Sequence, residues 1–181
     1  PAGARYVALD IDAARVEFLN RYLSLAGQEP LARCQDILSR PPSDRVDVAL
    51  LSGADGAHVG AEDLPPAEAR RLLGPDRILG VTAHDRGELG AIDPAVADYV
   101  GYGAVFGTRT RAGAEICGPE ALTAAGAAST LPVVAIGGIR PDNVEALRGS
   151  GVAAVAAAGS LVAFRTSPGA VEEFLRALGD W

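Results

Sequence analysis

Two glycine-containing segments carry the groups best suited to binding an anion. Residues 107–111 read Gly-Thr-Arg-Thr-Arg and offer hydroxyl donors and guanidinium cations. Gly137 and Gly138 place backbone N–H groups where no Cβ atom blocks the approach of a ligand. Each segment follows a short apolar run typical of a buried parallel strand, so both are expected at the carboxyl ends of neighbouring strands, where α/β proteins bind phosphate. We therefore predict a phosphate site between them.

A purely structural role for these residues is the alternative. Gly137 and Gly138 could form only a tight strand-to-helix turn, and the Thr/Arg run could be a solvated loop. Arg111 is the residue that this alternative explains least well. Its loop also contains Arg109, and guanidinium groups this close repel each other unless an anion lies between them.

The charge balance limits the classes of partner. The formal net charge is −7 and the isoelectric point is about 4.8, so the field of the whole chain repels nucleic acid and anionic membranes. All 16 basic side chains are Arg. A phosphorylated ligand must therefore be held by local cations, backbone amides or a metal ion.

Cysteine spacing and hydropathy bear on location. Cys34 and Cys117 lack CxxC or zinc-ligand spacing, and no apolar run is long enough for a signal segment or a bilayer span. We expect a cytoplasmic protein with reduced thiols. Because the sequence contains no Met, we also expect that Pro1 is not the translated start.

Apolar runs that alternate with helical patterns from residue 55 onward indicate repeated βα units. The predicted strands cover residues 56–59, 78–82, 99–103, 133–136 and 152–157. One helix is predicted over 67–73, a second begins at a capping box at 142–145 and ends at Gly149, and a terminal helix follows Pro168. The low aromatic content, 5%, fits strands packed beneath small-residue helices.

The N-terminal third is less regular. A strand is plausible over 6–9 and an amphipathic helix over 13–25, whereas two prolines make 40–43 an edge or a loop. This gives at most about seven strands, while a (β/α)₈ barrel normally takes roughly 200 residues or more. We predict a single α/β domain over residues 1–181, a TIM (β/α)₈-type barrel whose N-terminal part is irregular or incomplete.

Six segments occur in the order and approximate spacing of one enzyme family: residues 44–50, 53–60, 62–65, 80–84, 99–111 and 133–139. With them the chain resembles the thiamine phosphate synthase and TenI superfamily of TIM barrels, from about Asp44 to Phe164. No single segment is decisive. Together they make a specific signal.

The resemblance implies an enzyme that joins hydroxymethylpyrimidine diphosphate to thiazole phosphate and releases pyrophosphate. It implies a Mg²⁺ ion held by Asp44 and Asp63, and magnesium prefers such carboxylate oxygens together with substrate phosphates. The candidate catalytic residues that it implies are Ser43, Thr82 and Arg111. The candidate substrate-binding residues are His84, Thr108, Thr110, Gly138, Gly159 and Ser160. The expected partners are small phosphorylated substrates and, in a homodimer, a second copy of the chain.

The chain also departs from the family pattern. The family's Gln-Leu-Arg-Glu-Lys strand, which grips the diphosphate, has no counterpart, and the nearest segment, residues 7–12, is acidic. Ser43 replaces an Asn and Arg111 replaces a Lys, while Thr82 takes a hydroxyl position. Two other functions therefore stay open. A retired barrel would bind a phosphorylated thiazole-type ligand without turnover, and a TenI-like tautomerase would need a His where this chain has Ala104.

Four of the polar candidates also have structural interpretations. Asp44 and Asp63 could each be a helix N-cap instead of a metal ligand. His58 lies between apolar residues of a predicted strand and is more typical of a hydrogen-bonded core histidine than of a base. His84 ends a strand, where it could contact substrate or stabilise a turn.

Overall fold

The computed structural model describes residues 34–36, 46–51, 56–108, 115–157 and 170–178. The predicted strand at 6–9, the predicted helix at 13–25 and the proline segment at 40–43 lie outside the described residues. None of the described helices is long and apolar enough to cross a bilayer.

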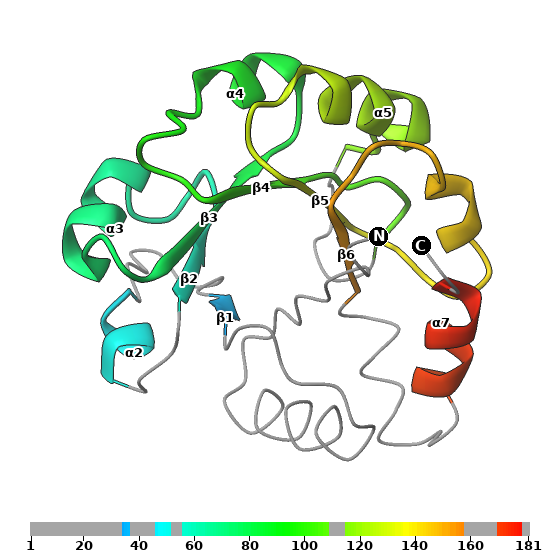
Figure 1. Cartoon of the computed structure of the whole chain (residues 1–181), viewed down its shortest axis with the longest axis horizontal. Coiled ribbons are helices and arrows are strands. Elements are labelled where there is room, and N and C mark those ends of the chain that lie inside the picture. Colours follow the sequence, from blue (N-terminus) through cyan, green and yellow to red (C-terminus); the bar gives the residue numbers. More distant parts are fainter. Residues whose placement is uncertain (1–33, 37–45, 52–55, 109–114, 158–169, 179–181) are drawn as a thin grey trace.

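The described residues form one six-stranded parallel sheet whose strand order is the sequence order. Its strands are β1 (Cys34–Asp36), β2 (Gly56–Val59), β3 (Ile78–Ala83), β4 (Tyr99–Tyr102), β5 (Val133–Ile136) and β6 (Ala154–Ala156). The helices are α2 (Val46–Leu51), α3 (Pro66–Leu73), α4 (Arg86–Ala91), α5 (Gly118–Ala128), the 3₁₀ helix η1 (Val144–Leu147) and α7 (Ala170–Leu178). The sheet curves, and these helices lie on its outer side (Figure 1). This is the arrangement of a TIM-type α/β barrel, as predicted.

Side chains alternate between the two faces of each strand, as a pleated strand requires. In β4, Val100 and Tyr102 belong to a cluster that packs against the helices on the outer side of the sheet. Tyr99 belongs to a separate cluster on the inner side, with Val134 and Ala154. The inner face is therefore the interior of the barrel. It carries Tyr99 and aliphatic residues together with the polar groups discussed below.

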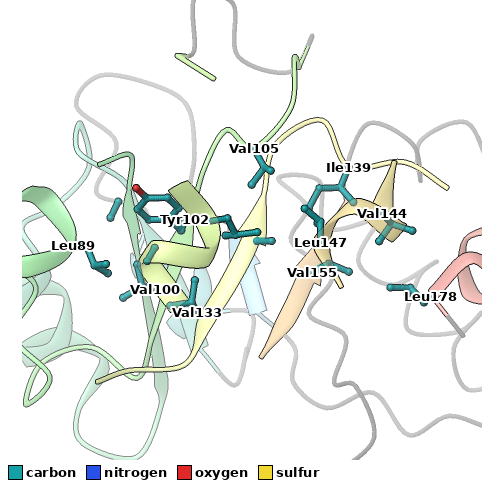
Figure 2. Close-up of a cluster of buried hydrophobic side chains, with 14 of the residues drawn as sticks. Leu89, Val100, Tyr102, Val105, Val133, Ile139, Val144, Leu147, Val155 and Leu178 are labelled. Carbon is teal, nitrogen blue, oxygen red and sulfur yellow. The ribbon is translucent and has the colours of Figure 1, made fainter. Parts of the chain in front are cut away.

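Two outer clusters join the sheet to its helices. One packs β2 and β3 against α2 and α3 through residues such as Val46, Val59 and Leu73. The other runs from α4 and β4 across to η1 and α7. In Figure 2, Leu89 lies at one side of this cluster and Leu178 at the other. Burying such aliphatic side chains contributes about 1.5 to 3 kcal/mol each, and this packing fixes the strand ends that carry the candidate site.

The predicted strands agree closely with the structure. β2 and β5 match to the residue, and the other predicted strands from residue 78 onward differ by only one or two residues at their ends. β1, α2, α4 and α5 are missing from the sequence prediction. The first three have only 3, 6 and 6 residues, which is too short to show a hydrophobic period, whereas α5 is rich in Ala and Gly and has no clear apolar face.

The predicted capping box at residues 142–145 is wrong. The element is a 3₁₀ helix of 4 residues, and the side chain of Asn143 makes no cap hydrogen bond. Asn143 Oδ1 instead accepts from the Arg140 amide at 2.8 Å, and Glu145 pairs with Arg148. Gly149 lies just beyond the helix with φ of 74°, so the predicted stop is present although the start differs.

Candidate active site at the carboxyl ends of the strands

The Gly137-Gly138 turn after β5 can be built only from glycine. Both residues have positive φ, 91° and 66°. A Cβ atom on Gly138 would lie 2.5 Å from the carbonyl oxygen of Gly107 and 2.7 Å from that of Phe106. The turn therefore packs directly against the backbone of the loop that follows β4, with no room for a side chain between them.

Backbone hydrogen bonds fix the same two segments side by side. The Val105 amide donates to the Ile136 carbonyl at 2.9 Å, and the Phe106 amide donates to the Gly137 carbonyl at 3.0 Å. Thr108, two residues further along this loop, therefore lies at the same end of the barrel as Gly138. The predicted juxtaposition of these two segments is confirmed, while their role in binding phosphate stays a prediction.

Asn143 secures the turn from the following segment. Its Nδ2 donates to the Gly138 carbonyl at 2.9 Å, while its Oδ1 accepts from the Arg140 amide at 2.8 Å. Sequence reasoning assigned Asn143 to a helix start, so this role was missed. The sequence does contain a signal for this role, which is an Asn five residues after a Gly-Gly pair. The carboxamide of Asn can donate and accept hydrogen bonds in the same turn.

A hydrogen-bonded chain of three side chains crosses the barrel interior. His58 Nδ1 lies 3.0 Å from the Tyr99 hydroxyl, and His58 Nε2 lies 2.7 Å from Thr82 Oγ1. His58 and Tyr99 are buried, whereas Thr82, near the carboxyl end of β3, is partly exposed. The prediction that His58 is a hydrogen-bonded core histidine is confirmed. The hydrogen bond between Tyr99 and His58 was not predicted from the sequence.

Burial decides the charge of His58. It lowers the pKa of the imidazole from 6.5 to about 4, because a charged ring in the barrel interior would lose its hydration. His58 is therefore neutral at physiological pH. One ring nitrogen then carries a proton and donates a hydrogen bond, and the other accepts a hydrogen bond.

Asp63 closes a turn immediately after β2. Its Oδ2 accepts from the Gly60 amide at 2.8 Å, and its own amide donates to the Gly60 carbonyl at 3.2 Å. The N-cap of α3 is Pro65 and carries no side-chain cap bond, so the interpretation of Asp63 as that cap is wrong. Its carboxylate lies partly exposed at the same end of the barrel as Thr82 and Gly138.

His84 follows β3 and stabilises the start of α4. Its amide donates to Glu88 Oε2 at 2.7 Å, and its Nδ1 lies 2.8 Å from the same oxygen. The interpretation of His84 as a turn-stabilising residue is therefore confirmed. Its side chain is partly exposed at the end of β3.

Six of the predicted site residues lie outside the described residues: Ser43, Asp44, Thr110, Arg111, Gly159 and Ser160. The structure brings together the ends of β2 to β5 that carry Asp63, Thr82, His84, Thr108 and Gly138. Among the described residues no group of three or more His, Cys, Asp or Glu side chains is placed to hold a metal ion. The predicted Asp44–Asp63 pair is not covered by that finding, since Asp44 is not described.

Comparison with known proteins gives the same family in sequence and in structure. The family model described as thiamine monophosphate synthase matches residues 43–161. The thiamine biosynthesis bifunctional protein ThiM/ThiE of Symbiobacterium thermophilum is 38% identical over 192 residues, which cover 99% of this chain and 40% of that protein. The thiamine-phosphate synthase of Laribacter hongkongensis is 44% identical over 137 residues, which cover 75% of this chain and 64% of that protein.

A solved structure matches the fold as well. Thiamine phosphate pyrophosphorylase from Pyrococcus furiosus superposes with a TM-score of 0.73 at 28% identity, covering 94% of this chain and 82% of that chain. The chain thus spans 40% and 64% of the lengths of the two curated relatives above.

Proposed function

Because the chain belongs to the thiamine monophosphate synthase family, we propose that it joins hydroxymethylpyrimidine diphosphate to thiazole phosphate, releasing pyrophosphate, in thiamine biosynthesis. One observation carries the proposal. The Gly137-Gly138 turn packs against the 105–107 backbone at the end of the barrel where Thr82 and Asp63 also lie. This provides hydroxyl and amide donors on adjacent strand ends for an anionic substrate.

The thiazole phosphate would be bound by the glycine turn and the loop facing it. Thr108 and Thr110 would offer hydroxyl donors, and the tight Gly137-Gly138 turn would present backbone amides to the phosphate. Gly159 and Ser160, which follow β6, would complete this subsite. Asn143 would hold the Gly138 peptide in place through its bond to the carbonyl.

In the reaction, the bond between the pyrimidine methylene carbon and the diphosphate oxygen breaks, and its electron pair leaves with pyrophosphate. The thiazole nitrogen lone pair then forms the new carbon–nitrogen bond. No proton needs to move in this exchange, so the protein acts by positioning both substrates and by stabilising the departing charge. Arg111, Thr82 and Ser43 are the residues assigned to that stabilisation.

The donor chemistry of Asp63 fits a magnesium ion. It is a carboxylate at the ligand end of the barrel, oriented by the Gly60 amide, and Mg²⁺ is bound in proteins by one or two carboxylates together with substrate phosphates. Asp63 and Asp44 would hold the ion. When bound, Mg²⁺ would neutralise diphosphate charge in a chain whose own net charge is −7.

The metal is tested by calorimetry with inorganic pyrophosphate, with Mg²⁺ and with EDTA. Asp63→Asn should weaken Mg²⁺-dependent binding of pyrophosphate, because an amide is a much poorer magnesium ligand than a carboxylate. The amide oxygen can still accept from Gly60, so thermal stability should change little. Equal pyrophosphate affinity in EDTA would contradict the metal site.

The reaction is tested by single-turnover formation of thiamine phosphate. Arg111→Ala should lower turnover far more than thiazole phosphate affinity, since the guanidinium would stabilise charge that grows only as the bond breaks. Arg111→Lys, the family's residue, should retain or improve turnover. No product from wild type at saturating substrates and Mg²⁺, and none from Arg111→Lys, would contradict the synthase activity.

A second candidate is a barrel that binds the thiazole-type phosphate without turnover. The feature that favours it is the acidic segment at 7–12, where the family has its diphosphate-gripping strand. Loss of one charge-assisted phosphate contact costs about 1.5 to 3 kcal/mol. In this candidate the Arg111→Ala effect would fall on affinity alone.

A further inference from the structure

The buried His58–Tyr99 pair spans a strand. In the sheet register His58 of β2 pairs with Gly80 of β3, and Gly80 pairs with Tyr99 of β4. The two rings therefore come from strands that are not neighbours, and they meet above the intervening β3. A Cβ atom on Gly80 would lie 2.3 Å from His58 Nδ1 and 2.4 Å from the Tyr99 hydroxyl, so the hydrogen bond exists because residue 80 has no side chain.

A second glycine makes room for the other side of the imidazole. A Cβ atom on Gly101 would lie 2.9 Å from His58 Cε1. Glycine inside a strand weakens it, because it loses more backbone freedom on folding and offers no side chain to pack. The interior therefore gives up strand stability at two positions to accommodate one polar ring. Aliphatic side chains could fill this interior without the two glycines, so packing alone does not explain why a histidine lies here.

The imidazole connects the interior to the ligand end of the barrel. Within the described residues, the hydroxyl of Thr82 has only one hydrogen-bond partner, His58 Nε2 at 2.7 Å. Thr82 is partly exposed and sits one residue before the end of β3. The direction of the bond to His58 therefore decides what the Thr82 hydroxyl offers to a ligand.

The two neutral tautomers of His58 have opposite consequences. If Nδ1 carries the proton, Nε2 takes the hydroxyl hydrogen of Thr82, which then presents only lone pairs to the ligand. If Nε2 carries the proton, it donates to Thr82 Oγ1, and Tyr99 donates to Nδ1. The hydroxyl hydrogen of Thr82 is then available to the ligand. Phosphate oxygens are acceptors, so only the second arrangement suits an anionic ligand.

We propose that His58 and Tyr99 are positioning residues that hold the Thr82 hydroxyl as a hydrogen-bond donor toward the anionic ligand, an inference that rests on the proposed function. The chain of donors runs from Tyr99 Oη to His58 Nδ1, and from His58 Nε2 to Thr82 Oγ1. The ring stays neutral throughout and transfers no proton. Its task is to orient one hydroxyl, which is a preorganised dipole for the developing charge of the leaving group.

The tautomer can be read by NMR, because the chain has only 2 histidines. Spectra of protein labelled with ¹⁵N in histidine, recorded for wild type and for His84→Asn, assign the ring of His58. We expect Nε2 to be protonated and Nδ1 unprotonated at neutral pH, with and without Mg²⁺ and inorganic pyrophosphate. A His58 ring protonated on Nδ1 in the pyrophosphate complex would overturn the proposal.

Tyr99→Phe is the most selective variant, because it removes one hydroxyl and keeps the aromatic ring. We expect a mixed His58 tautomer and about a tenfold loss of kcat, with KM for thiazole phosphate nearly unchanged. Thr82→Val should lower kcat further, whereas Thr82→Ser should retain most activity because it keeps the hydroxyl. Unchanged tautomer and kcat in Tyr99→Phe would overturn the proposal.

Val134→Ala is the matched control. Val134 packs with Tyr99 in the inner cluster and makes no hydrogen bond to the ring pair through its side chain. It should lower thermal stability while leaving the His58 tautomer and kcat unchanged. If Val134→Ala shifts both quantities as Tyr99→Phe does, general loosening of the interior explains the effect and the proposal fails.

Failure of the synthase activity can be separated from failure of this inference. If the wild type forms no thiamine phosphate, the proposed function is wrong. The positioning role is then tested by the affinity for inorganic pyrophosphate in the presence of Mg²⁺, measured by calorimetry. Tyr99→Phe should still weaken that binding several-fold and still mix the tautomer. Equal affinity of wild type and Tyr99→Phe would overturn the positioning role.

Discussion

The two ends of the barrel hold their polar groups in different ways. At the amino end, the guanidinium of Arg70 donates to the carbonyl oxygens of Val96, Gly74 and Arg77 and to the carboxylate of Asp98. Asp98 in turn accepts from the Leu79 amide at 2.6 Å. These contacts join the end of α3 to the segments that lead into β3 and β4.

The carboxyl end combines close backbone packing with shorter polar side chains. The Gly137-Gly138 turn packs against the loop after β4, Asn143 donates to the Gly138 carbonyl, and the partly exposed Thr82 hydroxyl bonds to His58. Arg70 at the amino end therefore joins structural elements, whereas the carboxyl end carries the candidate site.

The largest expected effect is on Gly138→Ala. The new Cβ would meet backbone oxygens at 2.5 and 2.7 Å at a φ of 66°, so we expect a loss of about 4 kcal/mol of unfolding free energy together with loss of phosphate affinity. Urea unfolding and calorimetry with inorganic phosphate measure the two quantities. Gly90→Ala, in α4 with no atom within 4 Å of its Cβ, is the control and should not destabilise. Normal stability of Gly138→Ala would contradict the close packing.

The next effect is the pH dependence of stability due to His58. Its folded pKa of about 4 lies below the unfolded value of 6.5, so between these values the unfolded chain binds the proton and the folded protein does not. The free energy of unfolding should therefore fall as pH drops from about 6.5 to 4, by about 3 kcal/mol in total from this group. Urea unfolding across this range, in a His84→Asn background, measures the slope. An NMR titration midpoint for His58 near 6.5 would contradict it.

Arg70→Met tests the amino end. It removes the donors to three carbonyls and one carboxylate while keeping an unbranched side chain, so we expect about 2 kcal/mol of destabilisation. Thiazole phosphate affinity at a temperature where the variant is folded should stay at the wild-type value. Arg71→Met, the exposed neighbour, is the control and should change neither quantity. A selective loss of affinity in Arg70→Met would erase the contrast between the two ends.

The smallest expected effect is on Asn143→Ala. The Gly138 carbonyl and the Arg140 amide would each lose a partly buried partner, at a cost of about 1 kcal/mol. Because the turn itself loosens, phosphate affinity should fall as well. Asp142→Ala, which affects only an exposed pair with Arg140, serves as the comparison. Wild-type phosphate affinity in Asn143→Ala would show that the turn needs no support from this side chain.

The sequence predicts the strands of this fold, and the juxtaposition of the loops after β4 and β5, because the signal is local. β2, β3, β4 and β5 are short apolar runs followed by glycine or polar residues, a pattern visible without any partner strand. The candidate positions Thr108 and Gly138 follow from that pattern, because parallel strands bring their carboxyl ends together. Thr82 follows from the family resemblance instead.

What could not be predicted depends on contacts across the sheet. The reason for glycine at residue 80 is a histidine and a tyrosine on the two flanking strands, and only the register brings them together. Asn143 was misread because a side chain that binds the preceding turn has the same composition signal as a helix cap. β1 is too short to carry a pattern of its own.

The sequential strand order has a consequence for how the chain folds. Every strand pairs with the next one along the chain, so each pairing in the described sheet closes a loop of only about 20 to 30 residues. Loops of that length are inexpensive to close, and each helix can cover its own pair of strands as soon as they meet. We therefore expect the chain to assemble by stepwise addition of βα units. A fragment that contains only β2 to β4 should then already show hydrogen-exchange protection.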